Sequence, residues 1–180
     1  MMNDIEKVLY TEEQLREKAR EIGRRVSEDY KGEELVVVGI LKGSIMFMAD
    51  VLKEITIPCV MDFMAVSSYG NSSTSSGVVR ILKDLDQQIE GKHVLIVEDI
   101  IDSGTTLKYL VKYFANKNTK SVEIACLLNK PERRKVELDI KYLGYQVPDY
   151  FLVGYGLDFA EKYRNLPYIG ILKPEVYEGK

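Results

Sequence analysis

Apolar runs of strand length alternate with helical repeats along most of the chain. Leu15, Ala19, Ile22 and Val26 recur at the spacing of one helix face, which predicts a helix over 11–29 with a capping box at its start. Further helices are expected at about 45–52 and from Leu107 onward. The apolar runs predict strands at 35–40, 57–66, 78–82, 94–99, 121–128, 139–146 and 151–155. Strands that alternate with helices indicate an α/β fold with a mainly parallel sheet.

One stretch near the middle of the chain combines this pattern with unusual polar residues. An apolar run that starts at Val94 is typical of a strand buried on both faces, and it ends in Glu98 and Asp99. The next loop holds a third carboxylate, Asp102, with a glycine and three hydroxyl side chains. Apolar positions at helical spacing resume at Leu107. The order is therefore strand, acidic edge, loop of small residues, helix.

This order suits a ligand that carries a phosphate beside a sugar. A helix N-terminus offers free backbone N–H groups to a phosphate, and Gly104 lets the loop backbone approach it closely. Ser103, Thr105 and Thr106 add hydroxyl donors. The carboxylates at the strand end would repel phosphate but accept hydrogen bonds from a sugar diol. An ordinary strand–turn–helix is the alternative, although three crowded carboxylates are costly without a ligand or a metal.

The sequence Glu98-Asp99-Ile100-Ile101-Asp102-Ser103-Gly104-Thr105-Thr106 resembles the phosphoribosyl-pyrophosphate (PRPP) signature of the type I phosphoribosyltransferases, in the form of their 6-oxopurine (hypoxanthine-guanine) branch. The resemblance extends from about residue 8 to 172. It implies an α/β fold, a mainly parallel twisted sheet flanked by helices, in a single domain over 1–180. A small hood would come from the N-terminal segment and about 130–180. The implied reaction transfers the 5-phosphoribosyl group from PRPP to N9 of hypoxanthine or guanine. It gives IMP or GMP plus pyrophosphate in purine salvage.

The resemblance also implies a set of site residues. Those for PRPP and its phosphates are Lys42, Gly43, Glu98, Asp99, Asp102, Ser103, Gly104, Thr105, Thr106 and Arg164. Asp102 is the candidate catalytic base at purine N7. Mg²⁺ is the implied cofactor, with Glu98, Asp99 and Asp158 as its candidate ligands. A cis peptide between Leu41 and Lys42 is implied as well. Without the resemblance, Arg164 reads as a surface arginine.

The purine would bind to Lys130, Phe151, Leu152 and Asp158 by the same resemblance. Phe151 would stack on the base, although its apolar neighbours equally fit a core aromatic. The Lys130 ammonium has donors and no acceptor, so it would serve the 6-oxo group of hypoxanthine or guanine and face the amino group of adenine unfavourably. The alternative for Lys130 is a solvated loop lysine.

The segment 67–77 is rich in serine and bounded by glycine, with Tyr69 as its one large apolar group. It lies between two predicted strands, and the family places a long hairpin there that begins with a Ser-Tyr pair, which Ser68 and Tyr69 match. We interpret it as a lid over the site rather than an inert loop or linker, because a lid must have low local stability.

The composition of the chain limits the kinds of partner that it is expected to bind. A net charge of −3, with 46% apolar and 29% charged residues, fits a globular protein without a broad attraction to nucleic acid or anionic membranes. No signal pattern or apolar run of about 20 residues is present, which predicts a cytoplasmic location. Cys59 and Cys126 lie in apolar runs and are expected to be free thiols. By resemblance the chain forms a homo-oligomer, a dimer or a tetramer.

Two other functions compete with the main one. A xanthine- or hypoxanthine-preferring enzyme differs only in contacts to the purine 2-position, and these are expected from backbone carbonyls near Leu152 and Asp158. A PRPP-sensing regulator that binds nucleic acid on the same fold would need a basic face or an additional helix-turn-helix. The sequence has neither an excess of lysine and arginine nor spare length for one.

Overall fold

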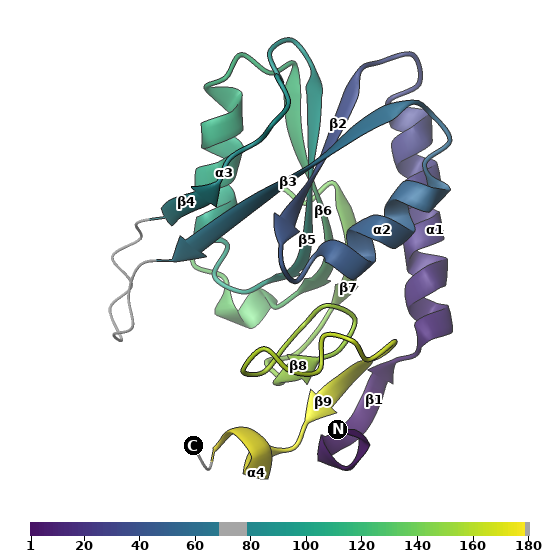
Figure 1. The fold of residues 1–180 in the computed structure, drawn as a ribbon, viewed down its shortest axis with the longest axis vertical. Coiled ribbons are helices and arrows are strands. Elements are labelled where there is room, and N and C mark those ends of the chain that lie inside the picture. Colours follow the sequence, from purple (N-terminus) through teal and green to yellow (C-terminus); the bar gives the residue numbers. More distant parts are fainter. Residues whose placement is uncertain (69–78, 179–180) are drawn as a thin grey trace.

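The computed structural model describes residues 1–68 and 79–178, and a six-stranded sheet forms its main body (Figure 1). The strand order is β4-β3-β2-β5-β6-β7, and every neighbouring pair is parallel except the antiparallel pair β3 and β4. The mainly parallel α/β sheet predicted from the sequence is thus confirmed. Its strands are β2 (Leu35–Leu41), β3 (Cys59–Ser68), β4 (Val79–Lys83), β5 (His93–Ile101), β6 (Ser121–Asn129) and β7 (Tyr142–Gln146).

Helices cover both faces of this sheet. The helices α1 (Glu12–Asp29) and α2 (Ile45–Glu54) lie on one side, and α3 (Thr105–Ala115) lies on the other (Figure 1). The two central strands serve both cores, because successive side chains point to opposite faces. Val37 and Leu95 pack with α1 and α2, whereas Val36 and Ile96 pack with α3. The continuous apolar runs of β2 and β5 follow from this double burial.

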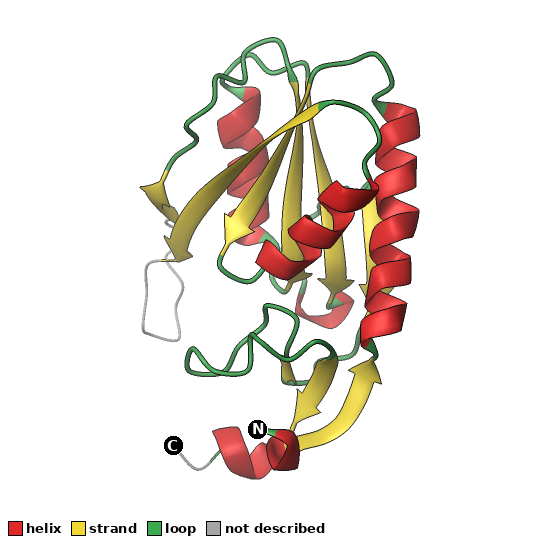
Figure 2. Cartoon of the chain, turned by 45° about the vertical axis from the view of Figure 1, so that its right-hand side comes forward, coloured by secondary structure: helices red, strands yellow, loops and turns green. Residues whose placement is uncertain are grey.

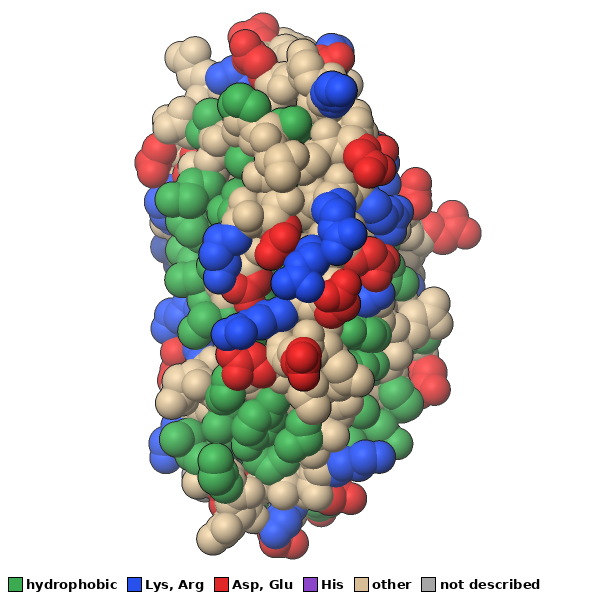
Figure 3. Space-filling view, turned by 90° about the vertical axis from the view of Figure 1, so that its right-hand side faces the viewer, with side chains coloured by type: hydrophobic (Ala, Val, Ile, Leu, Met, Phe, Trp, Pro, Cys, Tyr) green, Lys and Arg blue, Asp and Glu red, His purple; other side chains and the backbone are tan. Residues whose placement is uncertain are grey.

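The helix predicted at 11–29 begins as expected. Thr11 caps α1, and the reciprocal hydrogen bonds of a capping box join Thr11 and Gln14 at 2.9 and 3.3 Å. Lysines and arginines alternate with glutamates along the exposed side of α1. Figure 3 shows the resulting mixture of both signs on this face of the molecule. This face therefore offers no basic patch to a nucleic acid.

A second, three-stranded antiparallel sheet lies beyond the carboxyl ends of the parallel strands (Figure 2). It has the order β1-β9-β8, so the N-terminal segment pairs with a strand from the C-terminal end. The sequence pattern did not predict β1 or β9. Two register shifts each insert an extra residue in β1, and β9 has only four residues. The elements of this part are η1 (Met2–Asp4), β1 (Ile5–Tyr10), β8 (Leu152–Val153), β9 (Ile169–Leu172) and α4 (Pro174–Tyr177).

Some predicted boundaries differ from the observed ones. The strand expected at 139–146 begins at Tyr142, and the one expected at 151–155 is only the two residues of β8. Tight turns follow β8 because Gly154 and Gly156 have positive φ angles of 96° and 100°. A short 3-10 helix, η2 (Pro131–Arg133), follows β6. None of the described helices is long and apolar enough to cross a membrane.

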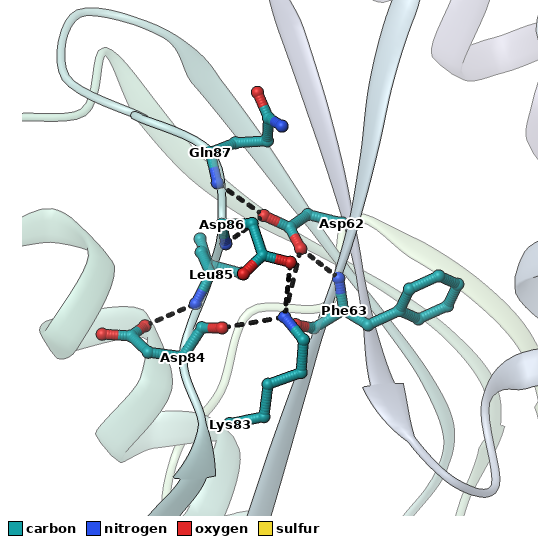
Figure 4. A network of polar contacts seen from close by, with 7 residues as sticks. All are labelled: Asp62, Phe63, Lys83, Asp84, Leu85, Asp86 and Gln87. Atoms are coloured by element: carbon teal, nitrogen blue, oxygen red, sulfur yellow. Dashed lines mark hydrogen bonds and ion pairs between the residues drawn. The ribbon is translucent and has the colours of Figure 1, made fainter.

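The turn between β4 and β5 is fixed by a buried carboxylate (Figure 4). Asp62 of β3 is 5% exposed, and it accepts hydrogen bonds from the backbone N–H groups of Phe63, Asp86 and Gln87 at 2.7–2.9 Å. The Lys83 ammonium lies 3.6 Å from the same carboxylate and donates to the Phe63 carbonyl at 3.0 Å. Asp62 therefore ties the segment after β4 to the sheet.

We expect Asp62→Asn to lower the free energy of unfolding at pH 7 by about 1.5–3 kcal/mol, the usual cost of losing hydrogen bonds to a charged group. Burial alone would raise the pKa of Asp62, but the three N–H donors and Lys83 outweigh it and hold that pKa below its usual range. A carboxyl whose pKa is depressed by folding contributes its stability above the unfolded pKa of about 4, and this contribution is lost as the pH falls through the folded pKa.

Urea unfolding between pH 2.5 and 7 checks this expectation. The variant should lose part of the acid dependence that the parent chain shows below about pH 4. Asp86→Asn is the matched control, because that carboxylate is exposed and pairs with the same Lys83 at 3.1 Å. An equal effect of both substitutions would contradict the role given to Asp62.

Candidate active site

The acidic edge lies at the end of the central strand. β5 continues through Ile101, so Glu98 and Asp99 point to opposite sides of the strand, and they line two different pockets. Glu98 lines a pocket of about 210 Å³ and Asp99 one of about 260 Å³. Both pockets are also lined by Ile100 and Asp102. The two pockets are therefore neighbours at the carboxyl end of the sheet, where open α/β sheets bind ligands.

Burial makes the two carboxylates costly to ionise. It raises the pKa of Glu98 well above its usual range, and the neighbouring Asp99 adds to this effect. Burial also raises the pKa of Asp99, although the N–H of Ile100 donates to its Oδ1 at 2.8 Å. Behind them, burial holds the Cys126 thiol at a high pKa, and its Sγ donates to the Leu128 carbonyl at 2.9 Å. A cation or hydrogen-bond donors from a ligand would therefore stabilise the ionised form of this pair.

The loop of small residues closes the first pocket. Gly104 has a φ of 79°, a conformation that residues with a Cβ rarely adopt, so this position strongly favours glycine. α3 begins at the next residue, and its N-cap Gly104 has no side chain to cap it. The Thr105 N–H makes only a long hydrogen bond of 3.4 Å to the Ser103 hydroxyl, so this helix start could bind an anion. The predicted phosphate residues that line this pocket are Asp102, Ser103, Gly104 and Thr106. The Thr105 hydroxyl is instead 2.8 Å from the Ser103 hydroxyl.

The loop after β2 meets the acidic edge directly. The Leu41–Lys42 peptide is cis, as the resemblance implied. A Cβ on Gly43 would lie 1.7 Å from Asp99 Oδ2, so only glycine permits this approach. A Cβ on Gly156 would lie 2.0 Å from the Gly43 carbonyl oxygen. Three segments that are distant in sequence, β2–α2, β5–α3 and 154–158, therefore touch at this point.

Arg164 reaches the same region from the segment before β9. Its Nη1 donates to the Gly156 carbonyl at 2.8 Å, and its Nη2 lies 2.9 Å from Asp158 Oδ1. Arg164 is therefore a half-buried, positioned guanidinium rather than a freely solvated surface arginine.

The second pocket gathers the residues expected at the purine. Lys130, Phe151, Leu152 and Asp158 all line it, together with Asp99 and Asp102. Lys130 is 6% exposed, so it is not the solvated loop lysine of the alternative interpretation. Its ammonium donates to the Tyr150 carbonyl at 2.7 Å and to Asp149 Oδ1 at 3.2 Å, and it lies 3.7 Å from Asp102 Oδ1. The buried ammonium is thus directed by one carbonyl and two carboxylates.

Phe151 occupies the wall of this pocket and is 36% exposed. Tyr177 stacks on it with a centroid distance of 4.7 Å and an interplanar angle of 19°, and Phe159 meets it edge-on at 5.4 Å. Phe151 is therefore neither fully buried in the core nor free on both sides. Tyr177 could not be identified from the sequence pattern, because α4 is only four residues long.

Three further residues of this region were missed by the sequence reasoning. Asp149 pairs with Lys130, Tyr177 supports Phe151, and Glu161 pairs with Lys42 and Arg164. Each has a partner that lies distant in the chain, Lys130, Phe151 and Lys42 respectively, so no local motif marks these pairs. Of the predicted lid at 67–77, Ser68 ends β3, whereas Tyr69 and most of the segment lie outside the described residues.

The expected magnesium ligands do not form one cluster. Within residues 1–68 and 79–178, no group of three or more His, Cys, Asp or Glu side chains is placed to hold a metal ion. Asp99 and Asp158 line one pocket, whereas Glu98 lines its neighbour. Mg²⁺ commonly takes one or two carboxylates and completes its shell with substrate oxygens and water. The donor set therefore fits a cation that arrives with a phosphorylated substrate.

Comparisons with known proteins agree with this geometry. The family described as the phosphoribosyl transferase domain matches residues 7–160. The hypoxanthine-guanine phosphoribosyltransferase of Bacillus subtilis (strain 168) is 54% identical over 179 residues, which cover 99% of both chains. A bifunctional protein TilS/HprT of Listeria monocytogenes is 56% identical over 98% of this chain, and the chain spans only 27% of that protein's length.

A solved structure gives the same result. The crystal structure of a hypoxanthine phosphoribosyltransferase from Staphylococcus aureus superposes with a TM-score of 0.96 at 52% sequence identity. The superposition covers 98% of this chain and 96% of that one. The fold is thus shared with the Staphylococcus aureus protein over nearly the whole of both chains. The chain belongs to the phosphoribosyl transferase family, in the group of the hypoxanthine-guanine phosphoribosyltransferases.

Proposed function

We propose that the chain transfers the 5-phosphoribosyl group of PRPP to N9 of hypoxanthine or guanine. The products are IMP or GMP and pyrophosphate, and the reaction belongs to purine salvage. The observation that carries this proposal is the pair of neighbouring pockets that meet at Ile100 and Asp102. One is lined by a phosphate loop and a carboxylate, and the other by a buried lysine and an aromatic ring. Their adjacency matches a reaction that joins a sugar phosphate to a base.

In this proposal the PRPP molecule spans three parts of the site. Its 5′-phosphate binds at the N-terminus of α3, to the loop Asp102–Thr106. Its ribose hydroxyls donate to the carboxylates of Glu98 and Asp99. Its pyrophosphate binds to the backbone of the Lys42–Gly43 loop and to Arg164, whose guanidinium suits phosphate oxygens. Fixing the sugar at several points orients its anomeric carbon toward the base, which lowers the entropic part of the barrier.

The base would lie in the second pocket, against Phe151 and near Leu152. Lys130 donates to the purine 6-oxo group, and Asp102 accepts the proton at N7. The 3.7 Å between Lys130 Nζ and Asp102 Oδ1 supports this assignment, because both groups could then face the same edge of the purine.

Mg²⁺ is the proposed cofactor, and Asp99 and Asp158 are the residues best placed to hold it with the substrate. When bound, it would neutralise charge on the departing pyrophosphate. We also propose that the protein works as a homo-oligomer, a dimer or a tetramer. Exposed apolar side chains of α2 and β3, such as Met46 and Met61, support this proposal. Light scattering at micromolar concentration would measure the assembly.

A purine panel tests the function. With PRPP and Mg²⁺, the protein should convert hypoxanthine and guanine to nucleotides, and adenine should react at least about 100-fold more slowly because its amino group opposes the Lys130 donor. Excess EDTA should abolish turnover, and added Mg²⁺ should restore it. Nucleotide formation is followed by absorbance and chromatography. The proposal would be contradicted if none of the purines were converted to a nucleotide, or if the protein kept full activity in EDTA. The rate with xanthine, compared with those of hypoxanthine and guanine, decides which 6-oxopurine the enzyme prefers.

A further inference from the structure

Two cationic side chains of the site share one carboxylate. Lys42 Nζ donates to Glu161 Oε2 at 2.8 Å, and Arg164 Nη2 lies 3.1 Å from Glu161 Oε1. Each carboxylate oxygen thus binds one cation. Among the described residues, Glu161 is the only carboxylate at ion-pair distance from Lys42. Lys42 and Arg164 lower the pKa of Glu161, so this side chain is ionised at neutral pH.

The backbone directs Glu161 toward these cations at a conformational cost. Phe159 and Lys162 exchange two backbone hydrogen bonds of 3.2 and 3.0 Å, which closes a two-residue turn over Ala160 and Glu161. Both turn residues have positive φ angles, 50° and 62°, which residues other than glycine rarely adopt. The Glu161 N–H also donates to Asp158 Oδ2 at 2.9 Å. A turn that keeps two unfavourable residues to aim one carboxylate indicates a role for that carboxylate.

We infer that Glu161 is an internal competitor of the pyrophosphate group, which neutralises Lys42 and Arg164 in the empty site and must leave them when pyrophosphate binds. This inference rests on the proposed function. Arg164 keeps its bonds to Gly156 and Asp158 when Glu161 leaves, so the guanidinium stays in position. Lys42 has no such second partner among the described carboxylates, so its ammonium is released for the ligand.

Competition of this kind weakens the bound state and favours release. Glu161 is 64% exposed, so solvent screens its ion pairs and a pyrophosphate of higher charge can displace it. When pyrophosphate departs, the carboxylate returns to the two cations and opposes rebinding. Product release limits turnover in many enzymes. Glu161 would therefore be a positioning residue that lowers the affinity for pyrophosphate and speeds its release.

Titration of inorganic pyrophosphate into the protein in excess Mg²⁺ tests the inference by calorimetry. Glu161→Gln should bind pyrophosphate about 3- to 10-fold more tightly than the parent chain, the range expected when two exposed ion pairs no longer compete. The inhibition constant of pyrophosphate against PRPP should fall by the same factor. Glu132→Gln is the matched control, because it removes the same charge from an exposed position on η2 and should leave both constants unchanged.

The outcomes separate the inference from the proposed function. Equal or weaker binding by Glu161→Gln, with a melting temperature like that of the parent chain, would overturn the competitor role. If Glu132→Gln gained the same affinity for pyrophosphate, the effect would come from net charge alone, and the competitor role would be overturned as well. The pyrophosphate affinity of Glu161→Asp should lie between those of the parent chain and Glu161→Gln, because the shorter side chain cannot reach both cations at once. If the parent chain forms nucleotide but Glu161→Gln binds pyrophosphate no more tightly, the proposed function stands and only the competitor role fails. If the parent chain neither binds pyrophosphate nor forms nucleotide, the proposed function itself is refuted.

Discussion

Replacing Gly43 by alanine is expected to lower kcat/KM for PRPP by about 100-fold or more while the protein stays folded. The new Cβ would lie 1.7 Å from Asp99 Oδ2 and 2.6 Å from Asp99 Cγ, and both distances are far below an ordinary van der Waals contact. The Gly43 backbone is packed against Gly156 and cannot retreat, so the Asp99 carboxylate must move by more than about 1 Å. A displacement of that size at a reacting centre costs about 100-fold in rate.

Steady-state kinetics with varied PRPP, beside a thermal melt, measure this effect. Gly91→Ala is the matched control, because it also adds a methyl group but meets no atom within 4 Å. Its φ of 71° should make that variant less stable by about 1–2 kcal/mol without changing kcat/KM. Gly43→Ala should thus lower kcat/KM for PRPP, whereas Gly91→Ala should lower only the stability. Normal PRPP use by a folded Gly43→Ala variant would show that Asp99 does not need its present position.

The part of the site that the sequence could predict is the part made from one continuous segment. Buried β5, the acidic pair, Gly104 and the start of α3 follow each other in the chain, so their relative geometry is set by local rules. The alternation of a strand sends Glu98 and Asp99 to different sides, and they line different pockets as a result. The positive φ of Gly104 follows from the turn between a strand and a helix.

The rest depends on contacts between distant segments, which no local pattern encodes. Lys42 and Glu161 are 119 residues apart, and a polar side chain at either position reads equally well as solvated surface. The small sheet joins β1 to β9 across almost the whole chain, and the register shifts in this pairing disturb the alternation along β1. Tyr177 supports Phe151 from a helix of four residues, too short to show a helical period.

Lys130 shows how such contacts change a prediction about stability. As an unpartnered ammonium in an open site, it would contribute little to folding. The structure instead buries it against the Tyr150 carbonyl and the Asp149 carboxylate, from the segment that leads into β8. Removing a buried charge that is hydrogen-bonded costs about 1–3 kcal/mol, because its partners lose their donor. We therefore expect a Lys130 variant to melt at a lower temperature as well as to lose activity.

Lys130→Gln is expected to lower kcat/KM for hypoxanthine and guanine by about 10- to 150-fold. This range corresponds to the loss of one charge-assisted hydrogen bond of about 1.5–3 kcal/mol to the 6-oxo group. Adenine should lose much less, because glutamine can accept a hydrogen bond from its amino group. The ratio of the guanine and adenine rates therefore reports on recognition of the base, whereas a common loss reports on the fold. Lys135→Gln, an exposed lysine on the same loop, should change neither rate nor melting temperature.

Asp149→Asn separates the two roles of the lysine. It keeps the ammonium but removes the carboxylate 3.2 Å away, so it should lower stability and leave the preference for 6-oxopurines in place. If Lys130→Gln slowed hypoxanthine, guanine and adenine by one common factor, the lysine would act through Asp102, whose Oδ1 lies 3.7 Å from the ammonium, and not on the 6-oxo group. A preference that falls in Lys130→Gln but not in Asp149→Asn would place the choice of base on this ammonium, because only the first variant removes the donor.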